Sequence, residues 1–315
     1  MAADVPMGRQ VHVKVPATTA NLGPGFDTLG MALSLYDELT ATVTKDAGVR
    51  VTVHGVGEGE VPTDETNLVA HSMIKTFEKY GVPVPGVELV CENRIQHARG
   101  MGSSSAAIVG GIMLAKGLLD GIVDIDAQGL LNIATELEGH PDNVAPALFG
   151  ALSIAWTTPN GPKHKKLIVH RGVSLLVAVP RNATMSTKVA RALQPEQVPH
   201  EDAIFNVSRS ALLIAALIQS PELLHEATED KLHQEYRAEA MPATNALVHS
   251  LRDAGFAAVV SGAGPSVLVL TDDPVERKRA ADLIEATGND EWECLMLAVD
   301  FKGATVVVLP DGSEN

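Results

Sequence analysis

The sequence predicts an α+β fold, in which strands and helices are mixed but do not alternate regularly. Short strand–helix–strand units occur in both halves, whereas a doubly wound sheet would repeat them throughout the chain. The length of 315 residues suits one large domain or two ordinary ones, and 45% of the residues are hydrophobic. A new strand begins at Ser174, just after Gly172. We therefore predict an N-terminal domain of residues 1–172 and a C-terminal domain of residues 173–315.

Apolar periodicity predicts the elements of the N-terminal part. Residues 11–15 alternate as a strand that Pro16 ends, and turn-forming residues then predict a long loop at 17–27. Apolar residues recur at helical spacing over 66–80, before Gly81 and Pro83. The other predicted elements are strands at 39–44 and 49–54 paired through a turn at 46–48, a strand at 87–91, a helix after residues 99–105, a helix at 126–138 capped by Asp126, a polar turn at 136–146, and strands at 151–156 and 167–170 separated by a charged break at 159–166.

The same patterns predict the C-terminal part. Its strands are expected at 174–179, 257–260, 267–270, 294–299 and 305–309, and its helices at 202–217, 221–228, 243–253 and 274–286. A glycine-rich segment at 261–266 separates two of these strands. No internal repeat or low-complexity tract is found.

Charge and composition exclude several classes of partner. The net charge is −15, whereas nucleic acids and anionic membranes attract a basic surface. Aromatic residues make up 3% of the chain, and the apolar run at 211–218 is far shorter than a membrane helix. The first ten residues lack the apolar region of a secretory signal, and Cys91 and Cys294 are expected to be reduced core residues. We therefore expect a cytoplasmic protein that binds neither nucleic acid nor membrane.

The segment at 99–105 has the chemistry of a phosphate-binding loop. Gly100 and Gly102 allow a tight turn and close approach to a ligand, and three serines follow at the start of an apolar helix. The free N–H groups of that first turn would favour an anion. The segment is not a Walker A loop, because Lys116 lies too far along the helix, nor a dinucleotide fingerprint, because Ser105 replaces its third glycine. A tightly packed helix start and a flexible linker remain alternatives.

Polar loops at 16–27, 136–146 and 261–266 could meet this segment in one cleft. Transfer of a phosphoryl group to an alcohol needs a phosphate cradle, a cation and an aligned hydroxyl group. Ser104 with Glu138 or Glu136 could hold Mg²⁺, and Arg191 and Arg237 could bind a carboxylate or a phosphate, although either could be a solvated surface charge. A serine hydrolase is disfavoured because no GxSxG motif occurs.

Five segments resemble the homoserine kinases of the galacto-, homoserine, mevalonate and phosphomevalonate kinase superfamily. PATTANLGPGFDTLG at 16–30 is similar to the first superfamily motif, and SGAGPS at 261–266 is similar to the third. RGMGSSSAA at 99–107 resembles the ATP loop, with Met101 where leucine is usual. EGHPDNVAP at 138–146 and LHQEYR at 232–237 resemble the homoserine kinase forms of their segments.

The resemblance implies a ribosomal-protein-S5-like N-terminal domain that binds ATP and a ferredoxin-like C-terminal domain. The implied reaction is phosphorylation of L-homoserine by ATP in threonine biosynthesis. The resemblance also allows a homodimer. It implies that Ser104 and Glu138 hold Mg²⁺, with Glu136 as the alternative. The implied ATP-binding residues are Arg99, Gly100, Met101, Gly102, Ser103, Ser104, Ser105, Ala106 and Ala107, and the implied substrate-binding residues are Asn21, Asp27, His140, Asn143, Thr187, Arg191, Arg237 and Gly262.

The resemblance does not identify a catalytic base. Related mevalonate-type kinases have a catalytic aspartate in this region, whereas this chain has Asp142 followed by Asn143, whose amide cannot accept a proton. We expect Asn143, Asp142, Glu138 and Arg191 to serve catalysis. Either the γ-phosphate takes the proton directly, or Asp142 or Asp27 acts as the base.

Overall fold

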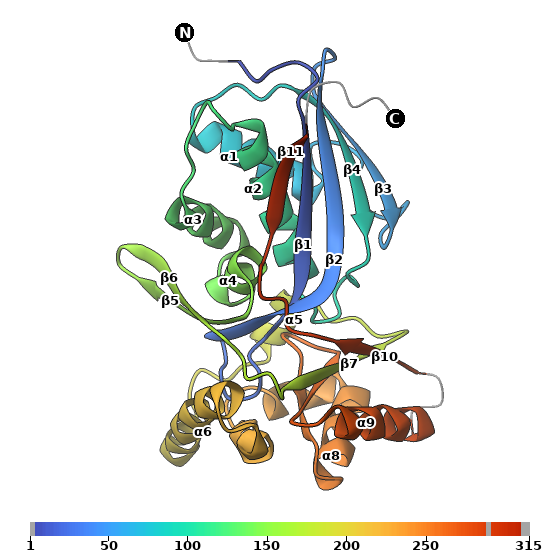
Figure 1. Cartoon of the computed structure of the whole chain (residues 1–315). Coiled ribbons are helices and arrows are strands. Elements are labelled where there is room, and N and C mark those ends of the chain that lie inside the picture. The colour runs from blue at the N-terminus through green and yellow to red at the C-terminus, as the bar shows by residue number, and fades with distance from the viewer. Residues whose placement is uncertain (1–3, 288–290, 310–315) are drawn as a thin grey trace.

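The computed structural model describes residues 4–287 and 291–309, which form two α+β parts stacked end to end (Figure 1). The N-terminal part contains a seven-stranded mixed sheet with the core order β11-β1-β2-β4-β3, and β5 pairs with both β2 and β6. Its strands are β1 (Gln10–Ala20), β2 (Leu29–Thr44), β3 (Val49–Gly55), β4 (Gly86–Asn93), β5 (Leu152–Thr158), β6 (Gly161–Leu167) and β11 (Thr305–Leu309). The strand β11 thus returns from the end of the chain to pair with β1.

Helices pack on one face of this sheet (Figure 1). They are α1 (Leu68–Lys79), α2 (Ser103–Leu118), α3 (Ala127–Glu138) and α4 (Pro141–Phe149). Most of α2 is buried, because its glycines and alanines let neighbouring elements approach its backbone closely. As predicted, Asp126 caps α3 by accepting a hydrogen bond from the Gly129 N–H.

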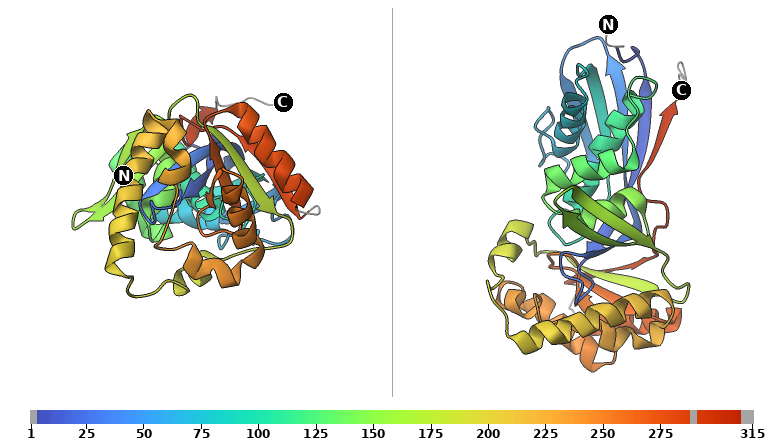
Figure 2. Two further views of the ribbon diagram at one scale, coloured as in Figure 1. Left: turned by 90° about the horizontal axis from the view of Figure 1, so that it is seen from below. Right: turned by 90° about the vertical axis from the view of Figure 1, so that its left-hand side faces the viewer.

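The C-terminal part contains an antiparallel four-stranded sheet in the order β10-β7-β9-β8. The strands are β7 (Ser174–Pro180), β8 (Ala257–Val260), β9 (Val267–Thr271) and β10 (Trp292–Leu297). The helices are α5 (Thr187–Ala192), α6 (His200–Ile218), α7 (Leu224–Ala227), α8 (Pro242–Asp253) and α9 (Pro274–Thr287), with short 3-10 helices η1 (Pro221–Leu223) and η2 (Glu235–Ala240). Seen from below, α6 and α9 lie along opposite edges of this part (Figure 2).

The second sheet is covered on both faces, which joins the two parts into one structure. Along β7, Leu175, Val177 and Val179 belong to the large core cluster that includes the N-terminal part. Leu176 and Ala178, which point to the other face, belong to a smaller cluster with α8 and α9. A strand buried on both faces explains the uninterrupted apolar run at 175–179.

The prediction that Pro16 ends the first strand is wrong. β1 continues to Ala20, and its register against β2 shifts between Pro16 and Ala17. Proline lacks the N–H of a regular ladder but is tolerated at such an irregularity. The predicted loop at 17–27 is therefore reduced to residues 21–28, and Thr18 becomes a strand residue.

The strands predicted to pair across 46–48 are not partners, because β4 lies between β2 and β3. The helix α1 connects β3 to β4, and this crossover makes the two strands parallel neighbours. The predicted break at 159–166 instead forms most of β6, and the predicted strand at 167–170 is not formed. Lysines are tolerated on β6 because it pairs with β5 alone and forms an edge.

The predicted polar turn at 136–146 is largely helical. α4 starts at Pro141, where a fixed φ and a missing N–H suit the first helical position. Asp142 and Asn143 consequently lie in the first turn of a helix. Their side chains are therefore held by regular backbone rather than by a flexible loop.

Candidate active site

The segment at 98–105 forms one wall of a cavity between the two parts. Gly100 and Gly102 have φ angles of +71° and +68°, a conformation that favours glycine. A β-carbon at Gly100 would lie 2.1 Å from the Ser261 carbonyl oxygen, and one at Gly102 would lie 1.9 Å from Thr18 Oγ1. α2 starts at Ser103, and no described side chain caps it. Its first N–H groups are therefore able to bind an anion.

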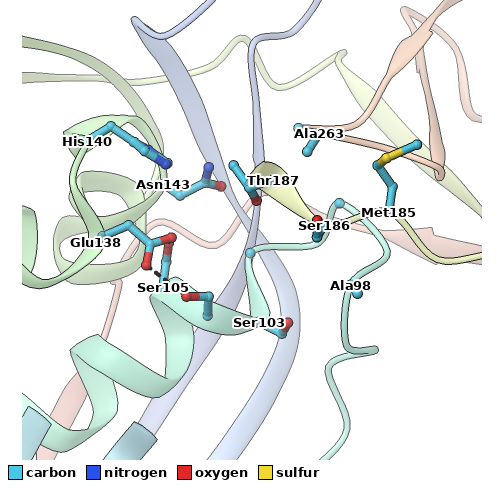
Figure 3. A pocket seen from close by; sticks show the side chains of 14 residues that line it. Ala98, Ser103, Ser105, Glu138, His140, Asn143, Met185, Ser186, Thr187 and Ala263 are labelled. Carbon is cyan, nitrogen blue, oxygen red and sulfur yellow. Dashed lines mark hydrogen bonds between the residues drawn. The ribbon is translucent and has the colours of Figure 1, made fainter. Parts of the chain in front are cut away.

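The serines of this segment bind a carboxylate instead of capping the helix. Ser104 Oγ donates to Glu138 Oε2 at 2.8 Å. Ser105 Oγ donates to Glu138 Oε1, also at 2.8 Å (Figure 3). Glu138 is the last residue of α3, which Gly139 ends with a φ of +94°. The other candidate, Glu136, is exposed and paired with Lys79. The fold thus brings Glu138 to the serines and directs Glu136 elsewhere.

The Asn143 amide is held in a defined orientation. Thr18 Oγ1 donates to Asn143 Oδ1 at 2.8 Å, which leaves the Nδ2 group as a donor for a ligand. Figure 3 shows the side chains of His140 and Asn143 pointing across the cavity toward Thr187, the first residue of α5. The arrangement could orient a hydroxyl oxygen, but the amide has no capacity to accept its proton.

His140 and Asp142 form a hydrogen-bonded pair beside Asn143. His140 Nδ1 hydrogen-bonds with Asp142 Oδ1, and Asp142 is 2% exposed. Burial lowers the pKa of His140, but the hydrogen bond and the charge of Asp142 outweigh burial and raise it overall. The pair therefore favours a protonated imidazole next to the cavity.

A bidentate ion pair joins the loop at 21–28 to α5. Arg191 Nη1 and Nη2 donate to the two carboxylate oxygens of Asp27 at 2.9 and 2.8 Å. Burial lowers the pKa of Arg191, but Asp27 outweighs it and raises that pKa, and the charges of Asp142 and Glu138 add to the effect. The pair therefore lies within electrostatic reach of the cavity's carboxylates.

Arg237 is a buried cation with no carboxylate partner in the described part of the chain. It is 2% exposed, and no carboxylate of the described residues lies within 4.0 Å of its guanidinium group. Nη1 donates to the Gly262 carbonyl at 3.3 Å. With the Gln194 amide turned to the orientation that satisfies both of its polar atoms, Nε donates to the Gln194 amide oxygen at 2.9 Å. Burial lowers the pKa of Arg237 to about 10. An anionic ligand would supply the charge that this environment lacks.

The loop at 261–266 is hydrogen-bonded to the segment at 98–105 and to the loop at 21–28. Ser261 Oγ donates to the Gly100 carbonyl at 2.6 Å, and Asn21 Nδ2 donates to the Gly262 carbonyl at 2.8 Å. The resulting cavity has a volume of about 230 Å³. Its lining consists of Ala98, Gly100, Gly102, Ser103, Ser104, Ser105, Glu138, His140, Asn143, Met185, Ser186, Thr187, Gly262 and Ala263.

A second cavity shares Ser103 and Ser104 with the first. Its volume is about 320 Å³, and it lies between α1, the end of β4 and the start of α2. It is lined by Val61, Pro62, Thr66, Asn67, Leu68, Val69, Asn93, His97, Ser103, Ser104 and Ala107. The first turn of α2 therefore lies between two adjoining spaces.

Some predicted site residues do not line the first cavity. The Arg99 guanidinium donates to the Pro180 and Arg181 carbonyls, so it ties the two parts together. Met101 and Ala106 are fully buried in the core, because their side chains point away from the loop. Asn21, Asp27, Arg191 and Arg237 lie beside the cavity, where hydrogen bonds and charges link them to its lining.

The sequence interpretation missed several lining residues and one supporting residue. Thr18 belongs to the first motif, but it was placed in a loop that is in fact a strand. Ser186 caps α5 by accepting from the Val189 N–H, and a serine and threonine before an apolar position could have signalled this helix. Ala98 and Met185 carry no such signal, because tertiary contacts alone bring them to the cavity, whereas Ala263 belongs to the segment at 261–266 that was expected there.

Comparison with known proteins identifies the family. Two family models match the chain, the GHMP kinases N terminal domain over residues 67–151 and GHMP kinases C terminal over residues 212–290. The chain is 67% identical to the homoserine kinase of Clavibacter michiganensis subsp. michiganensis, with 99% of each chain covered. It is 69% identical to the homoserine kinase of Leifsonia xyli subsp. xyli, with 95% of this chain and 92% of the relative covered.

A solved structure supports the same assignment. The crystal structure of homoserine kinase from Cytophaga hutchinsonii has a TM-score of 0.84 and 27% identity, with 96% of this chain and 98% of that chain covered. The two-domain α+β architecture with two sheets is thus that of the GHMP kinases. Sequence identity over the whole chain and the shared fold lead to one conclusion: the chain belongs to the homoserine kinase family of the GHMP kinases.

Proposed function

We propose that this protein transfers the γ-phosphoryl group of ATP to the side-chain hydroxyl of L-homoserine, giving O-phospho-L-homoserine for threonine biosynthesis. The observation that supports the proposal most directly is that a possible phosphate-binding segment and a group of charged side chains lie at the same cavity. An uncapped helix start with Ser104 and Glu138 forms one wall, and two arginines with Asp27 lie beside the other. The identity of 67–69% to named homoserine kinases supports the same reaction.

ATP would lie across the two adjoining cavities. Its phosphates would bind the segment at 99–105, where the backbone N–H groups of the first turn of α2 carry a partial positive charge. The nucleoside would occupy the second cavity, which shares Ser103 and Ser104 with the phosphate region. Within the predicted ATP loop, Ala107 lines this second cavity, whereas Met101 and Ala106 would support the loop from the core.

The Ser104–Glu138 pair fits a magnesium site. The described residues contain no cluster of three His, Cys, Asp or Glu side chains suited to a metal. Mg²⁺ in kinases often needs only one or two protein oxygens, because phosphates and water complete its shell. We propose Ser104 and Glu138 as these ligands, and not Glu136. When bound, Mg²⁺ would neutralise charge on the β- and γ-phosphates.

The substrate pocket would recognise a zwitterion by replacing an ion pair of the protein with two ion pairs to the substrate. Asp27 and Arg191 neutralise each other in the structure. A substrate carboxylate would bind Arg191 and Arg237, and the substrate ammonium group would bind Asp27. Asn21, Thr187, His140 and Gly262 would complete the pocket, with Asn21 already bonded to the Gly262 carbonyl.

The transfer step forms a bond between the homoserine hydroxyl oxygen and the γ-phosphorus and breaks the bond to the β–γ bridging oxygen. Asn143 Nδ2 would orient the hydroxyl oxygen, because Thr18 occupies the other end of the amide. Asp142 is hydrogen-bonded to His140 and Asp27 is paired with Arg191. We therefore propose that the hydroxyl proton passes to the transferred phosphoryl group, with positioning as the main contribution of the protein.

The first experiment measures ADP release with Mg-ATP and a panel of L-homoserine, mevalonate, L-threonine and L-serine. Selective turnover of L-homoserine is expected, because in this panel only L-homoserine carries a γ-hydroxyl together with an ammonium and a carboxylate group. Turnover of mevalonate instead would overturn the pocket assignment while keeping the ATP loop. ATP binding without turnover of any alcohol would overturn the proposed reaction.

Three further proposals concern the domain types, the cellular location and the oligomeric state. The N-terminal domain, predicted at residues 1–172, would be ribosomal-protein-S5-like, and the C-terminal domain, predicted at residues 173–315, would be ferredoxin-like. The four-stranded β10-β7-β9-β8 sheet with its covering helices supports the second assignment. The strand β11 follows this sheet in the chain but pairs with β1 in the sheet of the N-terminal part. None of the described helices is long and apolar enough to cross a membrane. We propose a cytoplasmic location, where ATP is available, and a homodimer that gel filtration would test.

A further inference from the structure

The Phe26 ring is contacted by two residues of the segment at 232–237. The rings of Phe26 and His233 stack with a centroid distance of 4.8 Å and an interplanar angle of 15°. Arg237 Cζ lies over the same ring, 5.2 Å from its centroid. Neither hydrophobic core cluster of the described chain includes Phe26. The ring is thus placed by a histidine and an arginine rather than by the core.

Phe26 belongs to a loop whose backbone is strained. Asn21, Leu22 and Asp27 all have positive φ angles, between 52° and 71°, which non-glycine residues rarely adopt. Such strain persists only where surrounding contacts hold the backbone firmly. The loop carries Asp27 and Asn21, so these contacts also determine where the polar groups of the site lie.

His233 anchors this loop from the C-terminal part. It is fully buried, and its Nε2 donates to the Gly23 carbonyl at 2.8 Å. Its Nδ1 is buried and has no hydrogen-bond partner among the described residues. Burial lowers the pKa of His233, so the ring is neutral with its proton on Nε2. A neutral ring can stack on Phe26 without adding a second positive charge beside Arg237.

The ring of Phe26 adds an electrostatic contact to the guanidinium group of Arg237. Arg237 has no carboxylate partner in the described chain, its Nη1 makes a long bond of 3.3 Å to the Gly262 carbonyl, and its Nε donates to the reoriented Gln194 amide. An aromatic face attracts a cation electrostatically, and more strongly where water is excluded. The face of Phe26 can therefore fix the guanidinium group before an anionic ligand arrives, without competing with that ligand for its N–H donors.

We propose that Phe26 is a positioning residue of the substrate pocket, which holds the Arg237 guanidinium and, with His233, the strained loop at 21–28 ready for an amino-acid substrate. This inference rests on the proposed function and adds a determinant of substrate affinity. The carboxylate would meet an arginine already in place, and Asp27 would be fixed by the residue that precedes it. Less ordering on binding would mean higher affinity.

The test replaces Phe26 by leucine and by mono-, di- and trifluorinated phenylalanine, which keep the ring shape but weaken the negative potential of its face. The KM for L-homoserine is expected to rise stepwise with fluorine number, and about 3- to 30-fold in Phe26→Leu. The kcat and the KM for ATP are expected to stay nearly constant, because the lost interaction acts on substrate binding. Calorimetry of L-homoserine binding should give the same order of dissociation constants.

Phe205 provides a matched control. Its ring also lies near cations, with Arg209 Cζ at 4.3 Å and Lys231 Nζ at 4.7 Å, but it does not line the first cavity. Phe205→Leu removes a comparable interaction and should leave the KM for L-homoserine unchanged. Thermal unfolding shows whether each variant is folded. If Phe26→Leu is not folded, the fluorinated variants alone test the role of Phe26.

Two results separate failure of the inference from failure of the proposed function. If the wild-type enzyme turns over L-homoserine and the KM for L-homoserine is the same in all fluorinated variants, only the role of Phe26 is overturned. A wild-type chain that neither binds nor phosphorylates L-homoserine would overturn the proposed function and this inference with it.

Discussion

The two walls of the cavity are built in different ways. The wall formed by 98–105 and Glu138 uses backbone groups of a contiguous segment, and its key hydrogen bond spans 34 positions of sequence. The opposite wall uses charged side chains from separate segments, with Asp27 and Arg191 separated by 164 positions. One wall depends on local backbone geometry, and the other depends on the docking of the two parts of the molecule.

This difference predicts how each wall responds to substitution. A backbone cradle presents N–H groups whatever the neighbouring side chains are, so it is sensitive mainly at its glycines and at Glu138. A wall of charged side chains distributes its binding among several residues, each of which can be removed alone. Changes to the first wall should therefore reduce turnover, whereas changes to the second wall should weaken substrate binding.

The largest effect is expected for Glu138→Gln. Loss of a carboxylate that would hold Mg²⁺ should lower kcat about 100- to 1000-fold, the range for removing one electrostatic contribution to a transition state. The KM for L-homoserine should change little, and excess Mg²⁺ should restore part of the rate. Steady-state kinetics over a range of Mg²⁺ concentrations measures this.

Glu136→Gln is the matched control for that variant. Glu136 lies on the same helix but is paired with Lys79 at the surface, so its replacement should leave the kinetic constants unchanged. Equal losses of kcat in both variants would contradict the choice between the two glutamates.

A smaller effect, on binding, is expected for Arg237→Ala. Loss of charge-assisted hydrogen bonds to a carboxylate should raise the KM for L-homoserine about 10- to 100-fold, with the KM for ATP unchanged. Arg209→Ala removes an arginine paired with Glu229 in the same part of the molecule and serves as the control. An unchanged KM for L-homoserine in Arg237→Ala would remove this residue from the pocket.

The smallest effect concerns stability near the first wall. The pKa of His140 is raised by Asp142, so the pair stabilises the fold fully below the ordinary histidine pKa of about 6.5 and loses this contribution as pH rises through the raised value. His140→Gln should remove this decline in Tm, a change of about 2–4 °C. Thermal unfolding between about pH 5.5 and pH 8.5, from one unit below to two units above the ordinary value of about 6.5, measures it.

His164 gives a contrast of opposite sign. Burial lowers the pKa of His164, so its protonation should destabilise the fold as pH falls below about 6.5. In His164→Gln, the plot of Tm against pH should become flatter at low pH only. Parallel curves for wild type and His140→Gln would show that the His140–Asp142 pair does not titrate as described.

The α+β class, most elements and the glycine-serine helix start could be predicted from the sequence. These features depend on the period of apolar residues and on the backbone freedom of Gly100 and Gly102, which are properties of neighbouring residues. The family resemblance was confirmed by identity over the whole chain. The sequence by itself therefore determined most of the segments that meet at the cavity and the family to which the chain belongs.

Only the tertiary structure decided which side chains meet. Glu138 rather than Glu136 faces the serines because of where α3 ends against α2. The placement of β4 between β2 and β3 depends on a crossover helix. Among the residues that the structure describes, Arg237 has no carboxylate partner and instead contacts Gly262 and the ring of Phe26. Contacts between residues of different elements leave no local pattern, because they arise from packing of whole elements and not from the conformational preferences of each residue.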